Sequence, residues 1–136
     1  MALELTIDKE TQIAESFTVA DGASIEKGTL MKLSDPNTVA ASDGDADIIA
    51  GVLKVEKVAS SGITQAAVWT RGVFKATAGG SITVGDALIT NASTGAANEL
   101  VTAGVNAENI VGRALETASD THTFLFELNP QTINVA

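Results

Sequence analysis

Few residues of this chain have the type and spacing that chemistry requires, and the acidic run Asp43-Gly44-Asp45-Ala46-Asp47 is the first of them. Alternating carboxylates are how calcium loops surround a hard cation with oxygen ligands. The EF-hand pattern also needs a glycine at its sixth position and a bidentate glutamate at its twelfth, where this chain has Ile48 and Lys54. We therefore interpret the run as a solvated acidic turn, keep a calcium site as the alternative, and expect neither a metal nor a cofactor.

The single histidine, His122, stands two residues after Asp120, a spacing that places both side chains on one face of a strand. Such a pair could activate a serine, but no Gly-x-Ser-x-Gly elbow accompanies it. The sequence has no phosphate-binding glycine motif, and it has no cysteine for thiolate catalysis. We expect a protein that is not an enzyme and has no catalytic residue, with a small hydrolase as a remote alternative.

Trp69 and Arg71 share one face of a predicted strand. If both were exposed, they would form a contact hot spot, because Trp and Arg are the side chains enriched there. The alternative that we favour is a core tryptophan beside a surface arginine.

The charge balance excludes several partners. The chain has 17 acidic and 8 basic residues, a formal net charge of −9 and a pI near 4.3. Such a surface repels phosphate backbones and anionic lipid, so we expect no nucleic acid and no membrane as partners. The apolar runs are too short to cross a bilayer, and the opening Met-Ala-Leu-Glu-Leu is acidic too early for a signal peptide. We expect a soluble protein that is not exported.

The elements that must position these residues are predicted to be strands. Apolar and polar residues alternate at both ends of the chain, in residues 3–7 and 124–128. Gly-based turns separate many short apolar runs, and the helical signals are weak. The pattern predicts an all-β fold, a small β-barrel or β-sandwich with little helix.

A loose internal repeat organises most of the chain. Ser24-Ile25-Glu-Lys-Gly28 returns as Ser81-Ile82-Thr-Val-Gly85, and Ile49-Ala-Gly51-Val-Leu returns as Ile110-Val-Gly112-Arg-Ala-Leu. Each copy is followed by another strand-like run, which indicates two pseudo-repeated halves, each half of a barrel. We predict that backbone geometry requires the turn glycines of the repeat, which are Gly28, Gly51, Gly85 and Gly112.

The N-terminal residues 1–20 lie outside this repeat. We predict that they form an arm or edge strand beside a single β domain at 21–136, and that the repeated halves close without them. Their apolar residues are too many for a solvated tail, so the arm is expected to pair with an exposed sheet edge on a neighbouring molecule. The alternative is that the segment is the first strand of the domain's own sheet. The candidate contacts are Leu3, Leu5, Ile7, Ile13 and Phe17.

The motif order of the chain resembles that of a known family. The matching segments are Gly28-Thr-Leu-Met, Ile49-Ala-Gly-Val-Leu, Val68-Trp-Thr-Arg-Gly-Val-Phe, Ile82-Thr-Val-Gly-Asp-Ala-Leu and Val111-Gly-Arg-Ala-Leu. In this order they resemble the capsid decoration (cement) proteins of tailed bacteriophages, over about residues 24–128.

The resemblance implies a virion protein, assembled in the host cytoplasm, that docks on the outer surface of the phage head. It implies the major capsid protein as partner and a homotrimer at threefold or quasi-threefold positions, and it supplies no catalytic residues. A head-fibre base or a host-surface carbohydrate-binding module is the competing class. The scarcity of aromatic residues, 4 % of the chain, argues against a carbohydrate site.

Overall fold

The computed structural model describes residues 4–22, 24–44, 46–91, 98–103 and 109–132, and within these ranges every regular element is a β-strand. The strands are β1 (Thr6–Lys9), β2 (Glu15–Val19), β3 (Leu30–Asp35), β4 (Thr38–Ala41), β5 (Ile49–Leu53), β6 (Gln65–Trp69), β7 (Gly72–Ala78), β8 (Ala87–Asn91), β9 (Glu99–Thr102), β10 (Asn109–Ala114) and β11 (Thr123–Thr132). The prediction of an all-β fold is confirmed. None of the described residues belongs to a helix long and apolar enough to cross a membrane.

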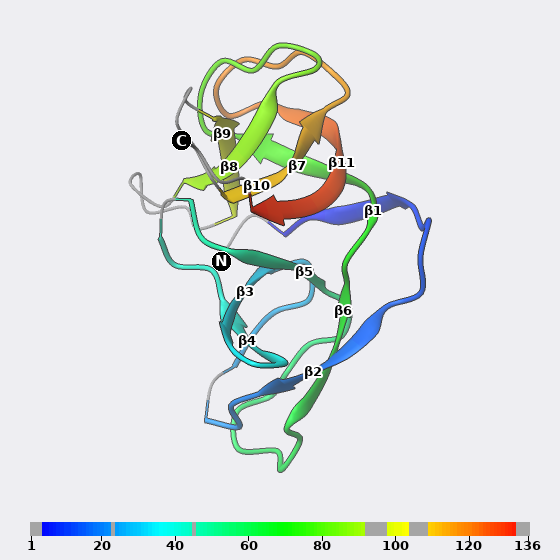
Figure 1. The fold of residues 1–136 in the computed structure, drawn as a ribbon, viewed down its shortest axis with the longest axis vertical. Helices are drawn as coiled ribbons and strands as arrows, with labels where there is room; N and C mark the ends of the chain where they lie inside the picture. The colour runs from blue at the N-terminus through cyan, green and yellow to red at the C-terminus, as the bar shows by residue number, and fades with distance from the viewer. Residues whose placement is uncertain (1–3, 23, 45, 92–97, 104–108, 133–136) are drawn as a thin grey trace.

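The strands form two small barrels, one above the other in Figure 1. Barrel one is the closed set β2-β4-β3-β5-β6. Barrel two has the order β7-β11-β10-β8-β9, and the β7–β9 pair closes it. In each barrel the closing pair is parallel and the other pairs are antiparallel.

The internal repeat is therefore present in the structure. Each copy forms a complete barrel, whereas the sequence predicted that each copy forms half of a barrel. Strands β2 to β6 correspond in order to β7 to β11, and every pairing in barrel one has its counterpart in barrel two. The isolated bridges Ile25–Lys57 and Ile82–Ala118 occupy matching places. The inference that closure needs nothing from residues 1–20 is wrong, because β2 is hydrogen-bonded to both β4 and β6.

Strand β1 is an addition to the repeat, and it pairs with the edge of β7 in barrel two. The N–H of Leu5, just before β1, donates to the carbonyl of Gly28 in barrel one at 2.8 Å. From Leu5 onward the chain therefore contacts both barrels, and it runs from β1 on barrel two into β2 of barrel one (Figure 1).

Strand β5 joins the two cores, and all five of its residues are buried. Ala50 and Leu53 pack in the core of barrel one, whereas Ile49 and Val52 join the larger core. Regular alternation would separate the members of each pair, but the β3–β5 register shifts between Gly51 and Ile49, so a bulge at Ala50 changes the faces. A chain of ring contacts, Trp69–Phe74–Phe126–Phe124, runs through the larger core. The larger cluster thus contains residues of both barrels, and the smaller cluster lies within barrel one.

Two of the repeat's glycines sit where strands come too close for a side chain. A Cβ on Gly51 would lie 1.9 Å from the carbonyl oxygen of Trp69, and a Cβ on Gly112 would lie 1.9 Å from that of Glu127. Gly28 and Gly85 have φ of 80° and 91°, the left-handed region that favours glycine. The same pair of backbone constraints therefore recurs in both barrels.

Candidate interaction surfaces

The residues that could do chemistry do not form a catalytic arrangement. Asp120 and His122 are both exposed, in the turn before β11, and the backbone N–H of His122 donates to the carbonyl of Ser119 at 3.1 Å. Within the described ranges, no three His, Asp or Glu side chains are grouped to hold a metal ion.

The acidic run forms a turn that is closed by its own hydrogen bonds. Oδ2 of Asp47 accepts from Ser42 Oγ at 2.8 Å and from the backbone N–H groups of Gly44 and Asp43 at 3.0 and 3.1 Å. Burial would raise the pKa of Asp47, but these hydrogen bonds hold it below its ordinary value. Asp43 pairs with Lys32 at 2.5 Å, which raises the pKa of that lysine. These contacts engage Asp43 and Asp47, two of the carboxylates that a calcium loop would use as ligands. The third, Asp45, lies outside the described residues.

The same turn links barrel one to barrel two through Thr90, which is fully buried on β8. Thr90 Oγ1 donates to the carbonyl of Gly44 and accepts the N–H of Asp47, both at 3.0 Å. The carbonyl of Thr90 accepts the N–H of Ala46 at 3.0 Å. The acidic turn therefore has a structural role between the barrels.

Trp69 is half-buried and already has its partners. Its Nε1 donates to Oε2 of Glu10 at 2.6 Å, and its ring packs edge-on against Phe74. Lys54 Nζ lies 5.6 Å from the ring centroid, within the range of a cation–π contact. Arg71 is exposed and is not the cation over the ring. These contacts agree with the core tryptophan that we favoured.

The five candidate contact residues fall in different environments. Leu5 is buried and Ile7 is partly buried, and both pack on the larger core. Ile13, in the link between β1 and β2, is 83 % exposed. Phe17 is half-buried, and Leu3 lies outside the described residues. Of the four that are described, Ile13 and Phe17 have the accessibility that an external contact requires.

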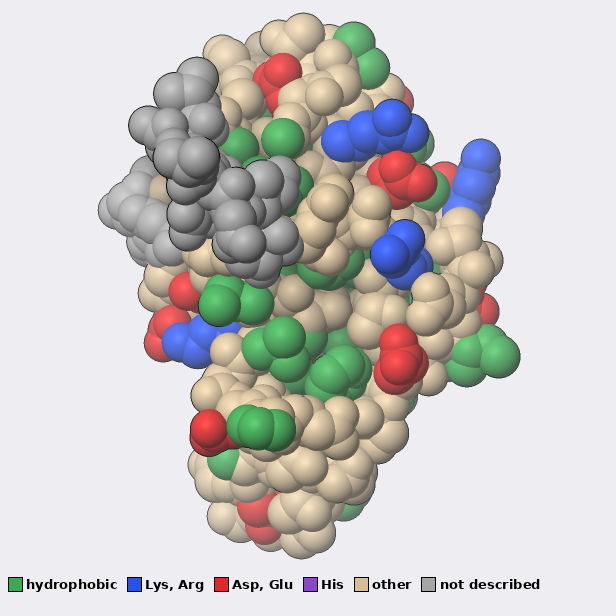
Figure 2. Space-filling model, viewed as in Figure 1, with side chains coloured by type: hydrophobic (Ala, Val, Ile, Leu, Met, Phe, Trp, Pro, Cys, Tyr) green, Lys and Arg blue, Asp and Glu red, His purple; other side chains and the backbone are tan. Residues whose placement is uncertain are grey.

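A groove where the two barrels meet gathers apolar side chains. We call it the waist groove, and its volume is about 340 Å³. Its apolar lining includes Phe17, Leu33, Ile49 and Pro130, and its polar lining is formed by Gln12, Glu15, Thr70 and Arg71. A smaller hollow beside it, of about 170 Å³, adds Ile48. Leu33 and Ile48 are 41 % and 48 % exposed. Figure 2 shows hydrophobic side chains across the middle of this face. The sequence did not single out Leu33 or Ile48, because the groove depends on how two barrels are placed.

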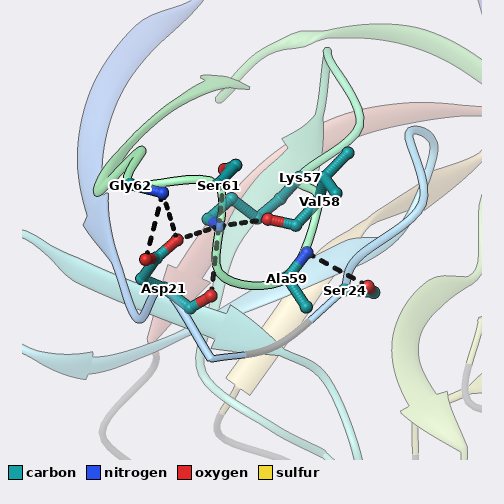
Figure 3. Close-up of polar contacts among 7 residues, drawn as sticks. All are labelled: Asp21, Ser24, Lys57, Val58, Ala59, Ser61 and Gly62. Carbon is teal, nitrogen blue, oxygen red and sulfur yellow. Dashed lines mark hydrogen bonds and ion pairs between the residues drawn. The ribbon is translucent and has the colours of Figure 1, made fainter.

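The other feature that the sequence did not reveal is an ion pair in barrel one between a buried lysine and a partly exposed aspartate (Figure 3). Lys57 is only 5 % exposed, and its Nζ donates to Oδ1 of Asp21 at 2.7 Å and to the carbonyl of Val58 at 2.6 Å. Both carboxylate oxygens of Asp21 accept the N–H of Gly62 at 3.1 Å. The hydrogen bond from Lys57, with that from Gly62, holds the pKa of Asp21 below its ordinary value. We call Asp21 and Lys57 with their partners the loop clamp.

Comparison with known proteins adds evidence that geometry cannot supply. A family model described as "Phage cement protein" matches residues 9–128. No curated protein matches the chain. Among solved structures, the N base of head fiber gp8.5 of bacteriophage phi29 is similar with a TM-score of 0.54 and 20 % sequence identity, over 90 % of this chain and 100 % of that chain. At that identity the structural similarity concerns the fold.

Proposed function

Because the chain belongs to the phage cement protein family, we propose that it binds the outer surface of an assembled phage head and bridges neighbouring capsomers. It is a structural, non-enzymatic protein of the phage head. The single observation that carries the proposal is the extent of the family match, from residue 9 to residue 128. That range contains all ten strands of the two barrels up to Leu128, so the match concerns the whole architecture.

The proposed role has a thermodynamic basis, because binding of the protein is coupled to assembly of the lattice. A molecule that binds the assembled lattice in preference to separated capsomers stabilises the lattice by its binding free energy. Many identical contacts of modest strength suffice when the lattice presents them in many copies. The net charge of −9 keeps such a layer from binding the nucleic acid of the phage.

We propose further that the protein acts as a homotrimer and that the waist groove is where its subunits meet. The groove exposes Leu33 and Ile48 beside Phe17, and apolar side chains gathered at one place are typical of protein contacts. Ile13, on the link between β1 and β2, is the nearby apolar residue with the largest exposure. Leu33→Ser with Ile48→Ser is expected to shift the protein from trimer to monomer in sedimentation velocity, with Val84→Ser in barrel two as the matched control. A protein that is monomeric before any substitution would contradict this part of the proposal.

The base of a head fibre is the second candidate function, favoured by the similarity to the phi29 head fiber base. A carbohydrate-binding module has less support. Phe74, Phe124 and Phe126 are fully buried, and Trp69 is half-buried with its Nε1 bonded to Glu10. A sugar would need an exposed aromatic face on which to stack, and among the described aromatic residues only Phe17 and Trp69 are even partly accessible.

The two candidates differ in what they do to the head. Purified protein would be added to heads that lack it, and the temperature at which the heads disrupt would be measured with and without it. A cement protein is expected to bind in many regularly placed copies and to raise that temperature. Binding that leaves the disruption temperature unchanged would favour the fibre base, and no binding would reject both.

A further inference from the structure

The end of barrel one farthest from barrel two differs from its counterpart in a way that points to a docking surface. This end is built by the β5–β6 connection, residues 54–64, which lies at the bottom of Figure 1. It exposes three large aliphatic side chains: Val55 (61 %), Val58 (62 %) and Ile63 (56 %). Val55 and Ile63 line one groove of about 280 Å³, together with Ala66 and Ala67 and the polar residues Glu56, Lys57 and Gln65. We call this surface the barrel-one tip.

Comparison of the two repeat copies shows that the β5–β6 connection of barrel one contains an insertion. The β5–β6 connection has 11 residues (54–64), and the equivalent β10–β11 connection has 8 (115–122). Ser60 and Thr121 are matched by their positive φ of 57° and 70°. Thr64 and His122 are matched because their carbonyls accept the N–H groups of the equivalent residues Val19 and Ala78. The three extra residues are therefore Ser61-Gly62-Ile63.

The loop clamp and the apolar side chains belong to the same difference. The bridge partner of Ile25 is Lys57, and the matching partner of Ile82 is Ala118, so barrel two has no lysine at this place. By the same alignment, Glu116 stands where barrel one has Val55, and Ser119 stands where it has Val58. The insertion and the clamp thus occur in barrel one and are missing from the equivalent connection of barrel two, where the exposed aliphatic residue is Leu115 at 37 %.

The clamp fixes the inserted residues in place. Lys57 bonds Asp21 and the carbonyl of Val58, while Asp21 holds the N–H of Gly62 next to Ile63 (Figure 3). Because Asp21 is partly exposed, this ion pair is expected to add little net stability. Its consequence here is a loop held in one conformation, which lowers the entropic cost of a later contact.

The proposed function identifies the occupant as the assembled phage head. Residues 58–65 contain no charged side chain, although the chain as a whole carries −9, and Glu56 is the acidic side chain that lines the groove. A mainly apolar contact of modest strength suffices on a partner that presents the same site many times.

We propose that the barrel-one tip is the surface through which this protein docks on the assembled phage head, in an apolar recess of the capsid-protein lattice. The inference rests on the proposed function, since it names the contact through which head binding occurs. Val55 and Ile63 insert into the recess, and the loop clamp holds them ready to do so.

The test compares Val55→Ser with Ile63→Ser, as a double variant, against the wild type and against Val84→Ser, which alters a similarly exposed valine (58 %) on barrel two. All three proteins should keep the same melting temperature and oligomeric state, because the substituted side chains are exposed. Binding to heads that lack the protein would be measured by co-sedimentation. The double variant is expected to bind at least about tenfold more weakly, and the control to bind as the wild type does.

Lys57→Met provides a second variant that keeps the aliphatic side chains but releases the inserted loop, and it is expected to weaken head binding. Undiminished binding by the double variant, while the wild type binds, would reject the tip and leave the proposed function standing. A changed oligomeric state with unchanged head binding would make the tip a subunit contact and overturn the proposal. Failure of the wild type to bind heads would reject the proposed function and the tip together.

Discussion

Replacing Gly112 by alanine tests the close approach of β10 and β11 on which barrel two depends. The added Cβ would lie 1.9 Å from the carbonyl oxygen of Glu127, 2.9 Å from its carbon and 3.2 Å from the backbone nitrogen of Asn129. All three atoms belong to the backbone of β11, so no side-chain rotation can relieve the clash. The strands must separate by about 1.5 Å to restore an ordinary contact between carbon and oxygen.

The expected cost follows from what that separation breaks. The β10–β11 register jumps between Ile110 and Gly112, so the ladder is already irregular there, and we expect two of its hydrogen bonds to be lost at about 1 kcal/mol each. Forcing extra volume into a packed interior adds about 1–3 kcal/mol. Gly112→Ala should therefore lower the free energy of unfolding by about 3–5 kcal/mol. The same change at Gly51, where the clash with Trp69 is equally close, should cost about as much.

Substitutions at two other glycines distinguish the cost of a steric clash from the cost of backbone strain. A Cβ on Gly85 would meet nothing within 4 Å, but its φ of 91° disfavours other residues, so Gly85→Ala should cost about 1 kcal/mol. Gly22 has open space and no positive φ, so Gly22→Ala should stay within about 0.5 kcal/mol of the wild type. The series would be measured by urea unfolding followed by circular dichroism. A Gly112→Ala protein no less stable than Gly85→Ala would refute the reasoning.

Three further predictions concern the clamp, the acidic turn and the N-terminal strand. Because the pKa of Asp21 is lowered in the folded protein, its contribution to stability is present above about pH 4 and is lost as the pH falls through its folded pKa. Asp21→Asn should remove that part of the acid dependence of the melting temperature, and a variant as acid-sensitive as the wild type would count against the clamp. Thr90→Val leaves the N–H of Asp47 and the carbonyl of Gly44 unpaired and should cost about 1–3 kcal/mol in urea unfolding, whereas an unchanged midpoint would show that the turn does not need Thr90. Deleting residues 2–9 removes β1 and should leave a folded but less stable protein by circular dichroism, whereas deleting 2–20 also removes β2 and should abolish folding; a folded 2–20 deletion would restore the idea of a separable arm.

The sequence predicted the repeat because backbone constraints leave a visible pattern. Gly51 and Gly112 have no room for a side chain, and Gly28 and Gly85 have positive φ, so the same residue stands at matching places. What the pattern missed was the start of the repeat. Strands β2 and β7 perform the same role, but Glu15–Val19 and Gly72–Ala78 share no motif, because a closing strand needs only alternation and hydrogen bonds.

The interaction surfaces were harder to predict, because burial and exposure there depend on contacts between distant segments. From the sequence, Leu5 is a candidate contact with another molecule, but in the structure Leu5 is buried in the core of this protein. Lys57 stands in a loop where solvent exposure is the usual outcome, and only the folded arrangement brings Asp21 to it. The exposed Val55 and Ile63 became informative only through comparison with the second barrel.

Cryo-electron microscopy of heads that lack the protein, incubated with purified protein, tests the central claim most directly. We expect density for two-barrel molecules on the outer surface at positions where capsomers adjoin, with the 54–64 end of barrel one against the capsid. Heads prepared in this way should also withstand a higher temperature than bare heads. Unoccupied heads, or density on the inner surface, would contradict the account.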